Sequence, residues 1–126
     1  MRGVGQVRRQ LATHPLSTLA VSTVTLMEIE FGLGQSPAKR PSVEAALGLW
    51  LPQMTILEYS EQDARVTASI RVALKVQGQP VGPYDLLNAG IALARGLTMV
   101  THNVREYSRV EGLDVSDWVD DDFATP

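Results

Sequence analysis

The side chains that could carry chemistry in this sequence are mainly carboxylates. The chain has no cysteine, which excludes thiol nucleophiles, disulfides and cysteine zinc sites, and it has only two histidines, His14 and His102. The acids at the most informative positions are Glu28, Asp85 and Glu106. Carboxylate oxygens are good ligands for hard cations. These residue types therefore favour cation-assisted chemistry over thiol or histidine-rich metal chemistry.

Asp85 opens a segment, residues 86–93, that is apolar almost all round and is therefore expected to be a buried helix. A carboxylate in such a place is costly to desolvate unless a partner compensates its charge. No lysine or arginine lies within one turn of it. A bound cation would supply the charge, and Asn88 could add an oxygen ligand or a hydrogen bond. The alternative is a first-turn acid that only stabilises the helix dipole, by about 0.3–1 kcal/mol.

Glu28 and Glu30 lie on one short expected helix, about 200° apart around its axis. They cannot share a face, so we expect one to face inward and the other to face solvent. Periodicity alone does not choose between them. The alternative is that both are surface carboxylates.

Thr101, His102, Asn103 and Glu106 follow directly after an expected strand, residues 97–100. In parallel sheets, ligand sites lie beyond the carboxyl ends of the strands, which makes this cluster a candidate site. The alternative is a polar loop that caps a short helix. Glycine-rich phosphate motifs, the GxSxG pattern of serine hydrolases and the HExxH zinc pattern do not occur.

The elements that would position these residues alternate between strand and helix. This order predicts an α/β fold with a parallel sheet. Strands are expected at 19–22, 54–57, 97–100 and 112–115, and helices at 4–11, 24–33, 41–51, 61–76 and 85–95. Gly32 and Gly34 are expected to end the second of these helices, and the serine or threonine at 22–23 to cap its start.

Length and charge limit the remaining possibilities. The 126 residues are expected to form one domain, 1–126, and the longest apolar runs fall short of the about 18 residues of a membrane span. The net charge of −3 includes an acidic tail, residues 120–126. The first 27 residues contain arginines and no acid. An anionic ligand such as RNA is therefore compatible with the charge distribution.

Three stretches together resemble the PIN-domain ribonucleases, specifically the VapC-type toxins of bacterial toxin–antitoxin pairs. They run from Ser22 to Gly32, from Gly78 to Leu87, and from Val100 through Tyr107 to Trp118. The resemblance covers nearly the whole chain. It implies a PIN-like three-layer α/β fold and a cytoplasmic, metal-dependent endoribonuclease toxin that is neutralised by an antitoxin protein, with a homodimer as a further expectation.

The resemblance also implies roles for individual residues. Glu28, rather than Glu30, resembles the family's metal-binding glutamate, and Asp85 resembles its next metal-binding aspartate. Asn103 stands where many PIN domains have a fourth acid, for which Glu106 is the candidate replacement. Thr101 resembles the family's threonine at that strand end. The expected cofactor is Mg²⁺ or Mn²⁺, and the expected substrate is RNA.

The sequence departs from the family pattern at its beginning. The central strand that carries the first catalytic acid has no counterpart here, since no acid precedes Glu28. We expect the natural start to lie upstream of Met1, and the chain as written to fold poorly and lack activity without that segment. The alternative is an inactive remnant that only binds an antitoxin-like peptide. A phospho-receiver domain is disfavoured because neither lysine, Lys39 or Lys75, follows a strand.

Overall fold

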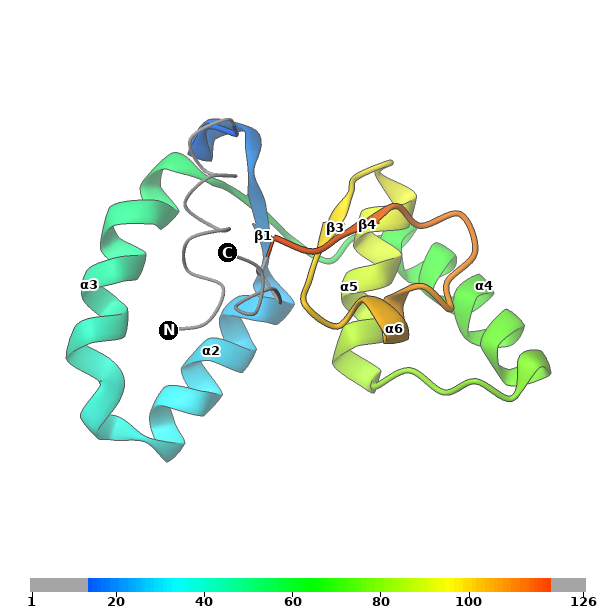
Figure 1. The fold of residues 1–126 in the computed structure, drawn as a ribbon, viewed down its shortest axis with the longest axis horizontal. Helices are drawn as coiled ribbons and strands as arrows, with labels where there is room; N and C mark the ends of the chain where they lie inside the picture. Colours follow the sequence, from blue (N-terminus) through cyan, green and yellow to red (C-terminus); the bar gives the residue numbers. More distant parts are fainter. Residues whose placement is uncertain (1–13, 119–126) are drawn as a thin grey trace, which may run out of the picture. The chain divides into compact units, whose positions relative to one another are not determined.

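The computed structural model describes residues 14–118, which fall into two compact units, 14–59 and 60–118. Each unit has its own pair of short strands and its own helices (Figure 1). The expected helix at 4–11 and the acidic tail at 120–126 lie outside the described residues.

The unit of residues 14–59 contains a pair of parallel strands and two helices. Strand β1 (Ala20–Ser22) pairs with β2 (Thr55–Leu57), and Val21 lies opposite Ile56. Between them run α2 (Thr23–Gln35) and α3 (Arg40–Trp50). Single 3-10 turns complete the unit: η1 (Leu16–Thr18), η2 (Pro37–Lys39) and η3 (Leu51–Gln53).

The ends of α2 follow from local hydrogen bonds. The Thr25 backbone N–H donates to Ser22 Oγ over 3.0 Å, which confirms Ser22 as the helix cap. The expectation that Gly32 and Gly34 end the helix is wrong. The helix continues to Gln35, and the Ser36 N–H then donates to the carbonyls of the last turn. Neither glycine has the positive φ with which a glycine ends a helix.

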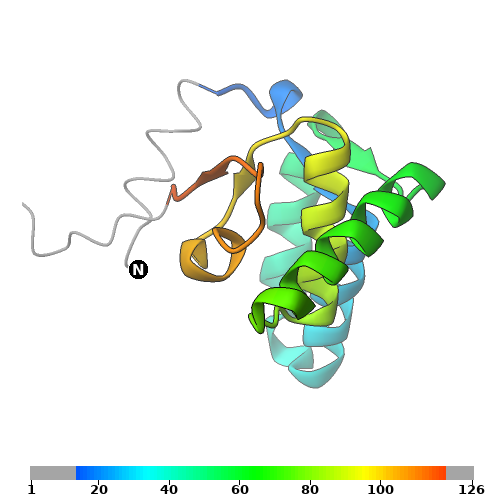
Figure 2. The same ribbon diagram turned by 90° about the vertical axis from the view of Figure 1, so that its right-hand side faces the viewer.

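The unit of residues 60–118 contains α4 (Glu61–Gln77), α5 (Pro83–Ala94), β3 (Met99–Val100), the one-turn α6 (Val104–Tyr107) and β4 (Val115–Ser116). Figure 2 shows α4 and α5 crossing each other, with α6 and the short strands beside α5. Strands β3 and β4 are parallel, and Met99 lies opposite Val115. The predicted parallel pairing is thus confirmed, although the strands of the described residues form two separate pairs.

The start of α4 is fixed by a capping box. Asp63 N–H donates to Ser60 Oγ (3.2 Å), and the Ser60 N–H donates to Asp63 Oδ2 (2.9 Å). Asp63 is also paired with Arg95 from the end of α5, through Nη2 to Oδ2 at 2.8 Å and Nε to Oδ1 at 3.3 Å. The Asp63 side chain is only 1% exposed, so its charge depends on this bidentate partner.

Helices α4 and α5 approach each other closely at Gly90. A Cβ atom placed on Gly90 would lie 1.8 Å from Thr67 Oγ1 and 3.2 Å from the Asp63 carbonyl oxygen. The Thr67 hydroxyl is fixed there because it donates to that same carbonyl over 2.7 Å. Only glycine therefore fits at position 90.

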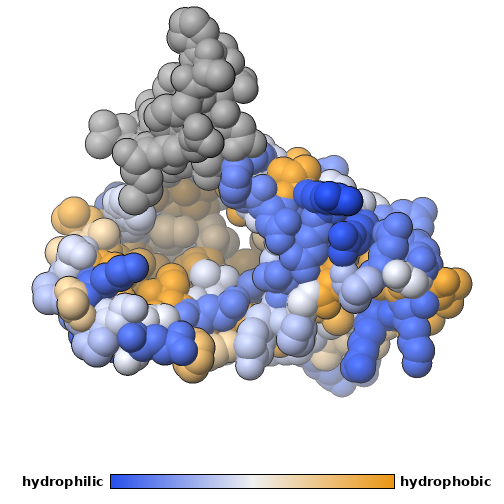
Figure 3. All heavy atoms as spheres, turned by 60° about the horizontal axis from the view of Figure 1, so that its bottom comes forward, coloured by the Kyte–Doolittle hydropathy of each residue, from blue (hydrophilic) through white to orange (hydrophobic). Residues whose placement is uncertain are grey.

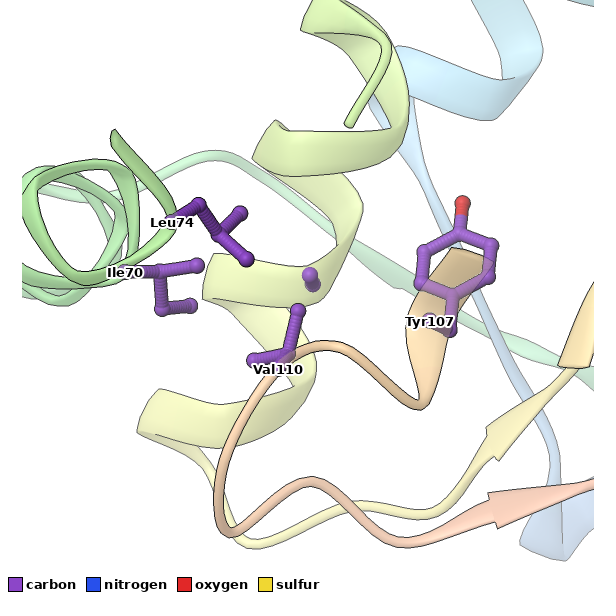
Figure 4. Close-up of a cluster of buried hydrophobic side chains, with 5 residues drawn as sticks. Ile70, Leu74, Tyr107 and Val110 are labelled. Carbon is purple, nitrogen blue, oxygen red and sulfur yellow. The ribbon is translucent and has the colours of Figure 1, made fainter. Parts of the chain in front are cut away.

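A single apolar cluster lies beside this contact. Its buried members come from α4, α5 and the segment around α6: Ile70, Leu74, Ala89, Tyr107 and Val110. Figure 4 labels all of these except Ala89. The cluster joins α6 to the two long helices. It therefore fixes the start of α5 and the residues of α6 in one unit.

The approach at Gly90 predicts the effect of adding one methyl group. Gly90→Ala should lower the free energy of unfolding by about 2 kcal/mol, because overpacking outweighs the better helix propensity of alanine. Thermal unfolding of the natural full-length protein measures it. The matched control is Gly32→Ala in α2, where nothing lies within 4 Å of the added Cβ. That change should be neutral or stabilise by about 0.5–1 kcal/mol. Equal effects at both sites would contradict this account of the packing.

The buried Asp63–Arg95 ion pair should contribute to the free energy of unfolding in a way that depends on pH. Hydrogen bonding from Arg95 lowers the pKa of Asp63, with a further contribution from Ser60. The charged carboxylate therefore stabilises the fold above its unfolded pKa of about 3.9, and this stabilisation is lost as the pH falls through the lower folded pKa. Asp63→Asn should lower the free energy of unfolding at pH 7 by about 2 kcal/mol.

The difference between Asp63→Asn and wild type should shrink on titration toward pH 2. Glu61→Gln is the control, since the Glu61–Arg65 pair is largely solvent-exposed (81% and 70%) and should matter little. A difference that stays constant from pH 7 to pH 2 would show that the charge of Asp63 is not the cause.

Candidate active site

Asp85 occupies the first turn of α5, two residues after Pro83 at the first helical position. Proline suits that position because its missing N–H is not needed there. The Asp85 side chain is half-buried, and the Tyr107 hydroxyl donates a hydrogen bond to its Oδ1 over 2.9 Å. Burial raises the pKa of Asp85, the Tyr107 hydrogen bond opposes that rise, and the neighbouring Glu106 reinforces it.

Glu106 lies beside Asp85 and is held by both of its oxygens. The Gly82 backbone N–H donates to Oε1 over 2.7 Å, and the Asn103 side-chain amide donates to Oε2. Gly82 is close to both carboxylates. A Cβ on it would lie 3.3 Å from Asp85 Oδ2 and 3.6 Å from Glu106 Oε1. The structure thus brings Asp85, Glu106 and Asn103 together.

The remaining polar residues of this cluster lie at the carboxyl ends of β3 and β4. Thr101 Oγ1 accepts a hydrogen bond from the Asn103 N–H over 3.0 Å, which shapes the turn into α6. His102 Nδ1 lies 3.1 Å from Asp117 Oδ2, just beyond the end of β4. Thr101 therefore supports the turn that presents Asn103.

The short α6 and the turn after it hold the loop that precedes Asp85. Arg109 Nη1 donates to the Pro80 carbonyl over 2.6 Å, in addition to the contacts of Glu106 with Gly82 and of Tyr107 with Asp85. Sequence reasoning assigned no role to Tyr107, Arg109 or Gly82. The one available signal for Tyr107 was its place directly after Glu106, since a buried tyrosine hydroxyl needs a polar partner.

Glu28 and Glu30 lie on α2, in the unit of residues 14–59. Both residues are exposed, so the expectation that one of them faces inward is wrong. Helix α2 instead buries Val24 and Leu33. Glu30 forms an ion pair with Arg40 (3.3 Å), whose guanidinium also bonds Glu44. The cluster around Asp85 belongs to the other unit, residues 60–118, and Glu28 has a defined place only within its own unit.

The donor atoms of the cluster suit a hard cation. Asp85 and Glu106 offer carboxylate oxygens, and Asn103 and Thr101 offer neutral oxygens. Burial, and after it the neighbouring Glu106, raises the pKa of Asp85, and a cation beside this carboxylate would favour its charged form. Within residues 14–118, however, no group of three or more acids or histidines converges on one point.

Comparison with known proteins gives these residues a context. Residues 4–113 match the family described as the PIN domain. This chain belongs to the PIN-domain family. Among curated relatives of this PIN domain, the "tRNA(fMet)-specific endonuclease VapC" of Salmonella typhimurium is 39% identical over 102 residues, 81% of this chain and 76% of that protein. The "Ribonuclease VapC2" of Rickettsia felis is 29% identical over 102 residues, 81% of this chain and 75% of that protein.

Solved structures confirm the predicted PIN-like α/β fold. A chain in the crystal structure of DNA-bound VapBC from Salmonella typhimurium matches with a TM-score of 0.80 and 36% identity, over 90% of this chain and 84% of that one. A chain of VapBC2 from Rickettsia felis, bound to a promoter DNA fragment, matches with a TM-score of 0.74 and 26% identity, over 92% and 96%. None of the helices described for this PIN domain is both long and apolar enough to cross a membrane.

Proposed function

We propose that this PIN domain is a metal-dependent endoribonuclease toxin of a type II toxin–antitoxin pair, acting in the cytoplasm on RNA phosphodiester bonds. The observation that carries the proposal is the pairing of Asp85 with Glu106, where Tyr107, Gly82 and Asn103 hold the two carboxylates side by side. Two like charges kept close together are costly in an ordinary surface cluster. Family membership and the ribonuclease names of the relatives support the same reading.

Asp85 is the residue of the carboxylate pair that would hold Mg²⁺ or Mn²⁺, and Glu28 is proposed as a metal ligand by family resemblance alone. When bound, such a cation lowers the pKa of water and neutralises charge on the leaving oxygen. Glu106, with both oxygens engaged by N–H donors, adds negative charge beside Asp85. Asn103 fixes the orientation of Glu106, and Thr101 fixes the turn that presents Asn103.

A cognate antitoxin is the proposed protein partner. The structures that resemble this chain at 26–36% identity come from VapBC assemblies. The unit of residues 14–59 also exposes large apolar side chains that a partner could cover: Met27, Phe31, Leu49, Trp50 and Ile56. Figure 3 shows that hydrophobic residues (orange) reach the surface of the protein. A homodimer is proposed as well, by family resemblance. The names of two relatives make tRNA(fMet) the first RNA to test.

A second candidate function is a catalytically inactive PIN module that only binds an antitoxin. It is favoured by the absence of a third acid or histidine at the carboxylate pair among residues 14–118. Cleavage of tRNA(fMet) by the natural full-length protein in Mg²⁺, and its abolition by EDTA, would exclude this alternative. Antitoxin binding without cleavage of any RNA tested would establish it and exclude the nuclease.

Removing the charge of either proposed metal ligand should abolish RNA cleavage. In the natural full-length protein, Asp85→Asn and Glu28→Gln should each lower kcat/KM by about 100-fold or more, or ~2.7 kcal/mol of transition-state stabilisation, with little effect on folding. Glu30→Gln is the matched control on the same helix. Glu30 only pairs with Arg40 at the surface, so this change should be nearly silent. Full activity of the Asp85 variant, or equal losses at Glu28 and Glu30, would refute the assignment.

Glu106 and Asn103, which lie at the Asp85 site, should contribute unequally to RNA cleavage. Glu106→Gln should lower activity more than Asn103→Ala, because it removes a negative charge beside Asp85 while the alanine change removes only a neutral donor to Glu106. We expect about a 10-fold larger loss for Glu106→Gln, within the range for residues that support metal ligands. Mg²⁺ titrations of cleavage by both variants provide the measurement. An unchanged Mg²⁺ requirement in Glu106→Gln would contradict the ranking.

A further inference from the structure

We propose that Tyr107 is a positioning residue for Asp85, whose hydroxyl sets the orientation in which that carboxylate meets a divalent cation. This inference rests on the proposed function, because it assigns Tyr107 a role in the same site. It follows from one hydrogen bond between segments 22 residues apart.

The ring of Tyr107 is anchored by apolar packing. The residue is 5% exposed and belongs to the cluster formed with Ile70, Leu74 and Val110. Figure 4 shows the hydroxyl at the far end of the ring, directed away from Val110. A tyrosine side chain has few rotatable bonds, so a packed ring also fixes the position of its hydroxyl oxygen.

The hydroxyl engages one defined oxygen of Asp85. It donates to Oδ1 over 2.9 Å, a normal length for an O–H···O bond. The other oxygen, Oδ2, lies on the side of Gly82, where an added Cβ would be only 3.3 Å away. The Tyr107 hydrogen bond therefore fixes Oδ1, while Oδ2 faces Gly82.

The neighbouring Glu106 gives such a restraint a purpose. Gly82 is close to both carboxylates, and when both are charged their repulsion favours rotation of Asp85 away from Glu106. Glu106 and Tyr107 are consecutive residues of α6. One turn of helix thus supplies both the repelling charge and the hydroxyl that holds Asp85 against it.

Tyr107→Phe tests the role, because phenylalanine keeps the packed ring and removes only the hydroxyl. The matched control is Tyr84→Phe, the same change at the exposed residue next to Asp85 (48% exposed). Mn²⁺ serves as the probe, and its binding to the natural full-length protein is followed by electron paramagnetic resonance of the free ion. The rate of tRNA(fMet) cleavage is measured at each Mn²⁺ concentration, and thermal unfolding is recorded for each variant.

The proposal predicts that Tyr107→Phe weakens Mn²⁺ binding by about 10–100-fold, as for other groups that orient metal ligands. The Mn²⁺ concentration for half-maximal cleavage should rise equally, with KM for RNA within about twofold of wild type. Tyr84→Phe should match wild type. Unchanged Mn²⁺ affinity in Tyr107→Phe, or a loss explained by unfolding alone, would overturn the positioning role.

The same data separate this inference from the proposed function. If wild-type protein cleaves RNA and Tyr107→Phe binds Mn²⁺ as tightly, the function stands and the positioning role fails. If wild-type protein binds Mn²⁺ in a manner that depends on Tyr107 but cleaves no RNA, the positioning role stands and the nuclease assignment fails. A wild-type protein that binds no Mn²⁺ overturns both.

Discussion

The close approach of α4 and α5 at Gly90 is the constraint from which the rest of residues 60–118 follows. A methyl group there would collide with the Thr67 hydroxyl, which is itself tied to the Asp63 carbonyl. Asp63 in turn caps α4 and pairs with Arg95 at the end of α5. The two helices are therefore joined at Gly90 by packing and at the Asp63–Arg95 pair by charge. The start of α5, which carries Asp85, has a fixed place relative to the core.

The apolar core is connected to the candidate site through Tyr107. Tyr107 belongs to the apolar cluster that includes residues of α4 and α5, and its hydroxyl reaches Asp85. Glu106 and Arg109, close by in the chain, bond the Gly82 N–H and the Pro80 carbonyl of the loop before α5. Residues 106–109 thus contact both the apolar core and the candidate site. That segment restrains the carboxylates, whose repulsion would otherwise separate them.

The sequence predicts the elements better than the contacts between them. Ser60 and Asp63 mark the start of α4 because capping is local, and Gly78 ends that helix with a φ of 67°. The parallel pairing also follows from the order of elements. Both β3 and β4 are shorter than the expected strands, and β4 begins later, because only two residues of each strand pair with the other. The Asp63–Arg95 and Tyr107–Asp85 contacts span 32 and 22 residues, so no local pattern indicates them. Family resemblance, rather than periodicity, distinguishes Glu28 from Glu30. The roles of Asn103 and Glu106 as metal-site residues remain predictions.

The proposed divalent-cation site of this PIN domain is the carboxylate pair centred on Asp85. Anomalous diffraction from crystals of the natural full-length protein grown with Mn²⁺ tests it most directly. The account predicts an anomalous peak within coordination distance, about 2.0–2.3 Å, of an Asp85 carboxylate oxygen, with the Tyr107 hydroxyl still bonded to Oδ1. A well-ordered Asp85 with no peak beside it, at Mn²⁺ concentrations that support RNA cleavage, would contradict the account.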